Sequence, residues 1–297
     1  MPKLKRLHKA ILCIVLSALG FTFMNLFVRL AGDVPTIEKT FFRNFFALII
    51  ASGAMIKNKH PILPPKGARL DLFMRSAAGY IGVCCNFYAI GRLNISDASL
   101  LNKMSPFFAI IFSGFLLKET ADRYQWAIII AAFIGSMFVI KPTFQNADLL
   151  ASALGFIGGM CAGAAYTFVR RAAQKGVKGY YVVFFFSAFS TLAAIPLMLT
   201  NFKLPTAEQL LYLLGAGVSA AAAQFAITTA YSYAPAKEVS IYDYSQILFS
   251  AAVGFIVLHQ VPDLWSILGY VLIVAAAFAM FKYNNRGKSE QPQQNKQ

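Results

Sequence analysis

The most constraining feature of this sequence is a succession of apolar runs, each about 20 residues long, that fills the chain almost from end to end. A helix needs roughly 20 mostly apolar residues to cross a hydrocarbon core about 30 Å thick. Ten segments meet this requirement, and short connections with Pro, Gly or Asn separate them. We therefore expect an all-α integral membrane protein with ten transmembrane helices. The predicted spans are 9–31, 36–56, 71–91, 96–117, 122–141, 148–170, 180–200, 207–230, 236–258 and 263–282.

The composition supports a membrane protein and argues against a nucleic-acid-binding protein. Hydrophobic residues make up 58% of the chain and charged residues only 13%, about half the charged share of a typical soluble domain. The net charge of +15 lies in short basic clusters between apolar runs and not in one basic patch. The lipid bilayer is therefore the expected partner, with no nucleic acid.

The basic clusters also predict how the chain is oriented. If the N-terminus is inside, 20 of the 27 lysines and arginines fall in inner segments and four in outer loops. Short loops rich in Lys and Arg remain cytoplasmic, so both termini are predicted to be cytoplasmic. The first apolar run is too long for the hydrophobic part of a signal peptide, and we interpret it as an uncleaved helix.

An internal repeat divides the chain into two units. A gapless offset of 141 residues aligns Phe27-Val28-Arg29 with Phe168-Val169-Arg170 and aligns the helix starts of both halves. We predict one five-helix repeat over 9–142, a second over 148–283, and a disordered cytoplasmic tail over 284–297. Because each unit has an odd number of spans, the repeats must be inverted, which is an architecture of transporters.

Short motifs add a resemblance to a known family. The segment from Ser96 to Glu119 has Pro106 in mid-helix and Gly-Phe-Leu-Leu-Lys-Glu at its end, and Gln125 to Ala127 follows in the next helix. Together with Pro35 and Arg43 in the second span, this pattern resembles the EamA family of the drug/metabolite transporter superfamily over about 9–282. The resemblance implies a multi-pass, inner-membrane (plasma membrane) carrier of metabolites with a central cavity. In the second repeat, Ile247 replaces the proline and Gln260 replaces the glutamate.

Lys103 and Asp243 are the deepest ionisable residues, and ionisable residues inside a bilayer usually have a function. Straight helices would place them roughly 10 Å apart in depth, so a direct salt bridge is not expected. In one interpretation they lie at opposite ends of one cavity, where Lys103 attracts an anionic group and Asp243 an ammonium group or a coupling proton. In the other, Lys103 extends outward to the interface and Asp243 pairs locally near the cytoplasmic face.

Arg43 lies two helical turns after Pro35, in the outer half of the second span. A guanidinium there can bind a carboxylate or phosphate through two hydrogen bonds. Alternatively, Arg43 pairs with Glu38 or Asp97 and holds an outer gate. Neutral polar side chains inside the spans also need partners, which a substrate or a neighbouring helix can supply. The candidates for substrate binding in this set are Asn25, Asn86, Asn102, Tyr166, Gln224, Tyr242, Tyr244 and Gln246.

The sequence favours a secondary carrier over other functions. It has no GxSxG, HExxH or P-loop motif, so we expect neither an enzyme nor an ATP-driven pump, and no cofactor or metal. The predicted function is movement of a small organic metabolite, such as an amino acid or another solute with an anionic group, by alternating access. Proton coupling through Asp243 is a separate hypothesis. A membrane-embedded solute sensor or a passive channel remains the alternative, and the protein is expected to be a monomer or a homodimer.

Overall fold

The computed structural model describes residues 3–58, 65–93, 100–141, 148–199, 202–258 and 261–289. All regular secondary structure in these ranges is helical. The first half contains α1 (Lys3–Leu30), α2 (Thr36–Lys57), α3 (Arg69–Arg92), α5 (Ser105–Leu117) and α6 (Arg123–Ile140). The second half contains α7 (Leu149–Gln174), α8 (Gly179–Leu199), α9 (Ala207–Tyr233), α10 (Ala236–Val239), the 3₁₀ turn η2 (Ser240–Tyr244), α11 (Ser245–Leu258) and α12 (Leu264–Ser289).

Local sequence explains where several helices begin. The side chains of Asp122 and Thr206 accept hydrogen bonds from the backbone amides of Gln125 and Gln209, which return the bond to form capping boxes. Pro35 precedes α2, where its missing N–H costs no helical hydrogen bond. These caps fix the starts of α2, α6 and α9 within one residue of the predicted spans.

The described helices match a ten-span membrane protein. By length and composition, nine helices in the described ranges could cross a membrane. The tenth is α3, whose 24 residues extend over about 36 Å but which carries Arg75 and Asn86 along its length. Arg75 and Asn86 line a polar cavity, which explains why α3 is more polar than the other spans.

Two spans are interrupted at equivalent positions of the two halves. The fourth span, Leu100–Leu117, breaks at Lys103 and Met104, immediately before Pro106 in the first turn of α5. The ninth span changes from α10 through η2 to α11, and the offset of 141 places Lys103 on Tyr244. Interrupted helices at matching positions of inverted repeats are typical of the substrate site in transporters.

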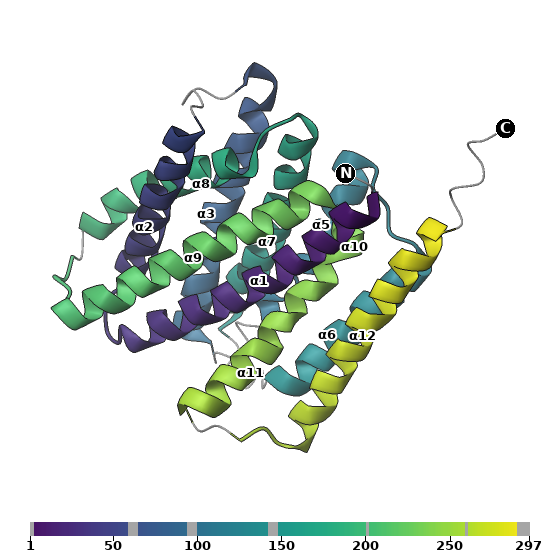
Figure 1. Ribbon diagram of the computed structural model, residues 1–297. Coiled ribbons are helices and arrows are strands. Elements are labelled where there is room, and N and C mark those ends of the chain that lie inside the picture. The colour runs from purple at the N-terminus through teal and green to yellow at the C-terminus, as the bar shows by residue number, and fades with distance from the viewer. Residues whose placement is uncertain are drawn as a thin grey trace.

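The two halves pack with approximate two-fold symmetry. Helix α1 packs against α9 and α11 as α7 packs against α3 and α5, while α2 faces α8 and α6 faces α12 (Figure 1). Close approach of small residues makes this packing possible. A Cβ added at Gly20 would lie 2.9 Å from the Cβ of Ala223, and one added at Gly82 would lie 3.3 Å from that of Cys161. These two contacts are equivalent under the offset of 141.

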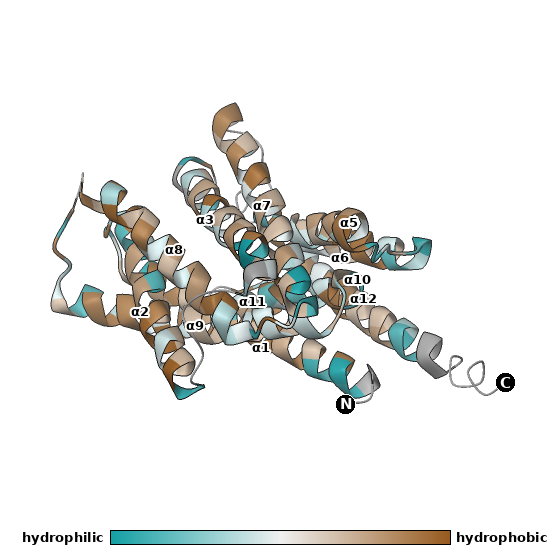
Figure 2. Ribbon diagram, turned by 90° about the horizontal axis from the view of Figure 1, so that it is seen from above, coloured by the Kyte–Doolittle hydropathy of each residue, from teal (hydrophilic) through white to brown (hydrophobic). Residues whose placement is uncertain are grey.

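Helix α1 begins and α12 ends on the same side of the molecule, which we call the N-terminal face (Figure 1). The opposite face carries the turn from Gly32 to Pro35 and the residues around Pro262. Large apolar side chains point outward between the two faces, for example Ile56, Phe115 and Phe278, which are 78%, 82% and 66% exposed. The helices are mostly hydrophobic in Figure 2, as expected for a surface that contacts lipid.

The last helix is longer than expected. Helix α12 continues to Ser289, whereas the sequence predicts a disordered tail from Asn284. Residues 290–297 lie outside the described ranges. Asn284 is buried, and its side-chain amide donates to the carbonyl of Glu238 over 3.2 Å, which ties this extra turn to α10. A contact of this kind is not visible in local composition.

Candidate functional site

A cavity of about 880 Å³ lies at the centre of the molecule. Its mouth at the opposite face is lined by Arg29, Thr36, Lys39 and Pro262, and it reaches inward to Lys103, Asp243 and Gly79. Residues from both halves line it, including both interrupted spans. The cavity therefore lies between the inverted repeats, where a transporter of this architecture has its substrate site.

Nine of the eleven side chains predicted from the sequence to bind substrate line this single cavity. The other two, Tyr242 and Tyr244, do not line it and pack into the apolar core instead. The nine cavity residues are Asn25, Arg43, Asn86, Asn102, Lys103, Tyr166, Gln224, Asp243 and Gln246.

Lys103 and Asp243 form a buried salt bridge, contrary to the expectation from the sequence. The ammonium nitrogen of Lys103 is 3.1 Å from Oδ2 of Asp243, and the two side chains are 9% and 8% exposed. The same nitrogen donates to Oε1 of Gln246 over 2.7 Å and to the carbonyl of Asp243 over 3.3 Å. The pair thus joins the two halves at the floor of the cavity, and neither residue marks a separate end of it.

The predicted depth difference was wrong because it assumed two straight α-helices. The ninth span passes through η2, and a 3₁₀ turn rises about 2.0 Å per residue instead of about 1.5 Å, which moves Asp243 deeper. The fourth span is broken at Lys103 itself, and the four-carbon stem of lysine carries its charge well away from the backbone. All three features shorten the distance between the charges.

Arg43 enters the cavity from α2 and pairs with no carboxylate in the part of the chain that the structure describes. Its Nε donates to Sδ of Met24 over 3.1 Å, and its buried Nη1 has no hydrogen-bond partner among the described residues. Glu38, one of the two predicted partners, accepts a hydrogen bond from the backbone amide of Lys203 instead, over 2.6 Å. The other, Asp97, lies outside the described residues.

Arg75 is a cavity residue that the sequence analysis missed. It is one of the 20 basic residues counted above as inner topology signals, but α3 begins at Arg69 and places Arg75 nearly two turns inside the helix. The guanidinium of Arg75 lies over the ring of Phe186, 4.2 Å from its centroid, and its side chain is buried. Gly79, one turn later, leaves the space that this guanidinium occupies. An arginine one turn before a glycine, inside a predicted span, is the signal that could have identified it.

Two amides add to the unpaired polar groups of the cavity wall. Oδ1 of Asn86 on α3 and Nε2 of Gln224 on α9 are buried and find no hydrogen-bond partner in the described part of the chain. Buried polar atoms in proteins are nearly always hydrogen-bonded, so unpaired ones around a cavity indicate groups that a ligand or water satisfies.

A layer of tyrosines closes the cavity toward the N-terminal face. Tyr166 on α7 stacks on the fully buried Tyr231 of α9, with ring centroids 4.7 Å apart and ring planes at 7°. Beside this stack, the hydroxyl of the buried Tyr244 donates to the carbonyl of Lys103 over 3.0 Å. These contacts join α7, α9 and both interrupted spans below the cavity floor.

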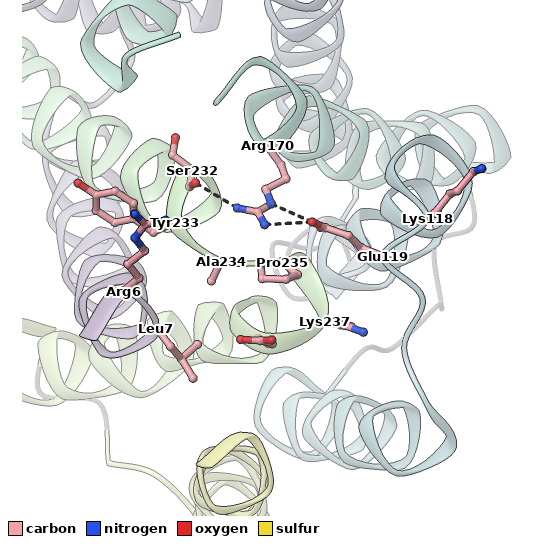
Figure 3. Close-up of a pocket in the computed structure, with 11 residues that line it drawn as sticks. Arg6, Leu7, Lys118, Glu119, Arg170, Ser232, Tyr233, Ala234, Pro235 and Lys237 are labelled. Atoms are coloured by element: carbon pink, nitrogen blue, oxygen red, sulfur yellow. Dashed lines mark hydrogen bonds and ion pairs between the residues drawn. The ribbon is translucent and has the colours of Figure 1, made fainter. Parts of the chain in front are cut away.

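One turn beyond Tyr166, Arg170 forms a second layer that we call the N-face latch, made of Arg170, Glu119 and the carbonyl of Ser232. Nε and Nη2 of Arg170 donate to Oε1 of Glu119 over 3.1 and 3.0 Å, and Nη1 donates to the carbonyl of Ser232 over 3.1 Å. Figure 3 shows Arg170 between these two partners. The latch ties the loop after α5 to α7 and α9.

The latch lines a pocket of about 670 Å³ on the N-terminal face (Figure 3). Arg6, Lys118 and Lys237 contribute positive charge to its wall, and Lys237 donates to the carbonyl of Thr120 over 2.6 Å. This pocket and the central cavity share no lining residue. The tyrosine layer and the latch therefore separate two spaces, and of these two the central cavity is the one lined by Lys103 and Asp243, where the spans are interrupted.

Comparison with known proteins identifies the architecture. Residues 8–141 and 149–282 each match the EamA-like transporter family. A Pseudomonas aeruginosa protein named pseudopaline exporter CntI is 32% identical over 276 residues, which cover 92% of this chain and 96% of that protein. Human solute carrier family 35 member G1 is 24% identical over 276 residues, covering 88% of this chain and 76% of the relative.

Two further comparisons, with a named transporter and with a solved structure, agree with this match. The riboflavin transporter of Vibrio cholerae is 31% identical over 177 residues, which cover 57% of each protein. A solved crystal structure shares the fold, with a TM-score of 0.83 at 16% identity over 93% of this chain and 98% of the other. The family and these named relatives are transporters and not enzymes. With both halves matched and a full-length relative at 32% identity, the chain belongs to the EamA-like transporter family.

Proposed function

We propose that this transporter is a secondary carrier that moves a small organic solute with an anionic group across the plasma membrane by alternating access. The observation that supports it best is the central cavity, which opens to one face, is closed to the other, and holds the buried guanidinium groups of Arg43 and Arg75. A buried charge is strongly unfavourable unless a partner compensates it. An anionic group of the substrate is the compensating partner in this proposal.

Comparison of equivalent residues supports alternating access. Tyr166 and Arg170 form the closed layers toward the N-terminal face. Their equivalents under the offset of 141 are Asn25 and Arg29, which are exposed and line the open cavity at the opposite face. The same structural position is therefore closed in one half and open in the other. In an inverted-repeat carrier, exchanging these two arrangements moves the opening from one face to the other.

The N-terminal face is the cytoplasmic face in this proposal, so the central cavity opens to the outside. Basic residues at the ends of helices retain short loops in the cytoplasm. At the opposite face the described lysines and arginines are Arg29, Lys39, Arg92, Lys141 and Lys203. At the N-terminal face they include Lys5, Arg6, Lys9, Lys57, Arg69, Lys118, Arg123, Arg170, Arg171, Lys175, Lys178, Lys237 and Lys282.

Proton coupling through Asp243 forms the second part of the proposal. A proton on Asp243 would remove its attraction for Lys103 and leave the ammonium free to bind an anionic group of the substrate. Binding of the proton and of the substrate would then be linked. Replacement of Asp243 by Asn should make uptake insensitive to a pH gradient, and uptake by that variant that still follows the gradient would exclude this role.

The experiment that tests the proposed transport cycle is uptake of a mixed pool of labelled amino acids, organic acids and nucleotides into proteoliposomes, measured with imposed gradients in both directions. The variants Lys103→Ala and Asp243→Ala are compared at equal amounts of folded protein.

We expect one class of solute to accumulate with the wild type and to be lost in both variants. Equilibration without any accumulation, unaffected by gradients, would indicate a passive channel. If no solute crosses the membrane while the folded protein still binds one, the protein would be a solute sensor and not a carrier.

A further inference from the structure

The charges around the central cavity do not balance. Among the described residues that line it, the cations are Arg29, Lys39, Arg43, Arg75 and Lys103, and the one carboxylate is that of Asp243. Three of these cations have a partner or contact with solvent. Lys103 is paired with Asp243, Lys39 donates to the carbonyl of Gly32 over 2.6 Å, and Arg29 is exposed at the mouth.

The two cations that remain are also the most buried, apart from the paired Lys103. Arg43 and Arg75 are 7% and 2% exposed, and neither forms a salt bridge with a carboxylate of the described residues. Within the described ranges, Nη1 of Arg43 and Nε of Arg75 have no hydrogen-bond partner. Each guanidinium thus keeps an unused donor as well as its charge.

Neutral groups hold both guanidiniums in place. Arg43 donates to the thioether of Met24 over 3.1 Å, and Arg75 lies 4.2 Å from the centre of the Phe186 ring. A thioether is a weak acceptor and an aromatic face is a weak partner for a cation, so these contacts orient the side chains without neutralising them. An arginine with a purely structural role would normally meet a carboxylate or several carbonyls.

The two guanidiniums also line the same cavity, together with the side chain of Tyr166. Arg43 comes from α2 and Arg75 from α3, and α8 packs against both of these helices. Two buried like charges that line one cavity are stabilised when one ligand neutralises both.

We infer that the substrate carries two acidic groups, or one doubly charged phosphate, and that Arg43 and Arg75 together bind this double negative charge. This inference rests on the proposed function and narrows its substrate class. A neutral solute would leave two buried charges uncompensated, and a solute with a single negative charge would leave one. A dianion compensates both through charge-assisted hydrogen bonds of the guanidinium groups.

The test begins with the purified full-length protein in nanodiscs and a pool of labelled metabolites that spans neutral, monoanionic and dianionic compounds. Each compound that the wild type retains is then compared with an analogue that lacks one negative charge. A dicarboxylate is compared with its half-amide, as for succinate and succinamate, and a phosphate monoester with its methyl diester. These two arms distinguish a dicarboxylate from a phosphate as the source of the double charge.

We expect the wild type to prefer the dianion over its singly charged analogue by about 10- to 100-fold in Kd. In Arg43→Gln and in Arg75→Gln this preference should fall to within about threefold, because only one guanidinium is left to meet the second acidic group. A purely structural effect would weaken both ligands equally and leave the preference unchanged. Arg92→Gln, which removes an exposed arginine that does not line the cavity, is the matched control and should retain the preference.

Two results would overturn the inference. One is retention of a neutral or singly charged compound as tightly as any dianion, and the other is a folded wild type that retains no dianion from the pool. Transport of a singly charged solute that depends on Lys103 and Asp243 would overturn the inference and leave the proposed carrier function intact. Failure of every solute to cross the membrane would instead contradict the proposed function.

Discussion

The hydroxyl of Tyr244 donates a hydrogen bond to the main-chain carbonyl of Lys103 over 3.0 Å, and these two residues are equivalent positions of the two repeats. A residue meets its own equivalent only near a symmetry axis, so the pseudo-two-fold axis passes through this contact. Lys103 also binds Asp243 and Gln246 of the second half. The polar cluster at the cavity floor is therefore the point at which both interrupted spans are joined.

The Lys103–Asp243 pair should behave as a buried ion pair in stability measurements. Removing one partner, as in Lys103→Ala or Asp243→Ala, leaves a buried charge without compensation and should lower the free energy of unfolding by about 3–5 kcal/mol. The double variant Lys103→Met/Asp243→Leu should recover most of this loss. Reversible unfolding in mixed micelles gives the free energy of unfolding of all three variants. A double variant that is as unstable as the sum of the single ones would contradict the assignment of a paired cluster.

The N-face latch should control access to the cavity from the N-terminal face. Glu119→Gln removes the charge from the carboxylate that Arg170 binds, and we expect the open form to become about tenfold more populated. The rate at which an impermeant thiol reagent labels Ala162→Cys from the N-terminal face, with the four native cysteines replaced, reports this population.

The matched control for the latch is Glu208→Gln. Glu208 is exposed on α9 near the opposite face and bonds only with Tyr212 among the described residues. Labelling of Ala162→Cys in this control should equal that of the parent. An unchanged labelling rate in Glu119→Gln would show that the tyrosine layer alone closes this side.

Gly159 is predicted to be intolerant of any side chain. A Cβ there would lie 2.5 Å from the carbonyl oxygen of Leu101, so Gly159→Ala must push α7 away from the fourth span. We expect a loss of about 1–3 kcal/mol in stability. Gly53→Ala on α2 is the control, because a Cβ at Gly53 meets nothing within 4 Å, and it should change stability by at most about 1 kcal/mol. Equal effects of the two substitutions would exclude close packing at Gly159.

The pKa of Asp263, in the loop just before α12, should lie at about 2, below its usual range. Hydrogen bonds from Lys141 and from the amide and side chain of Ser266 are the cause, since they favour the charged carboxylate. A lowered pKa in the folded state contributes stability that is present above about pH 4 and is lost as pH falls toward 2. Asp263 should therefore not make the stability of the folded state depend on pH between pH 5 and 8.

Carbon-13 NMR of protein labelled at aspartate carboxyl groups can measure this titration in micelles. Lys141→Met should move the midpoint of Asp263 toward 4. A midpoint that stays near 2 in this variant would show that the interaction with Lys141 is not the main cause.

Several residues that line the cavity were predictable from the sequence because ionisable and amide side chains are rare inside apolar spans. Lys103, Asp243, Arg43 and Gln224 stand out for this reason, and all four line the cavity. Tyr244 was selected by the same criterion but points into the core, because the 3₁₀ turn of η2 changes the helical phase. Arg75 was missed because a basic residue near the start of a span resembles a topology signal.

The sequence by itself determined the ten spans, the five-plus-five repeat and the transporter family, because these depend on local hydrophobicity and on a pattern that repeats along the chain. Only the tertiary structure decided which charges meet. Lys103 and Asp243 are 140 residues apart in the chain, and their contact depends on interrupted helices and on side-chain reach. The missing partners of Arg43 and Arg75 are likewise a property of packing, since a charge is uncompensated only relative to the groups that the fold places around it.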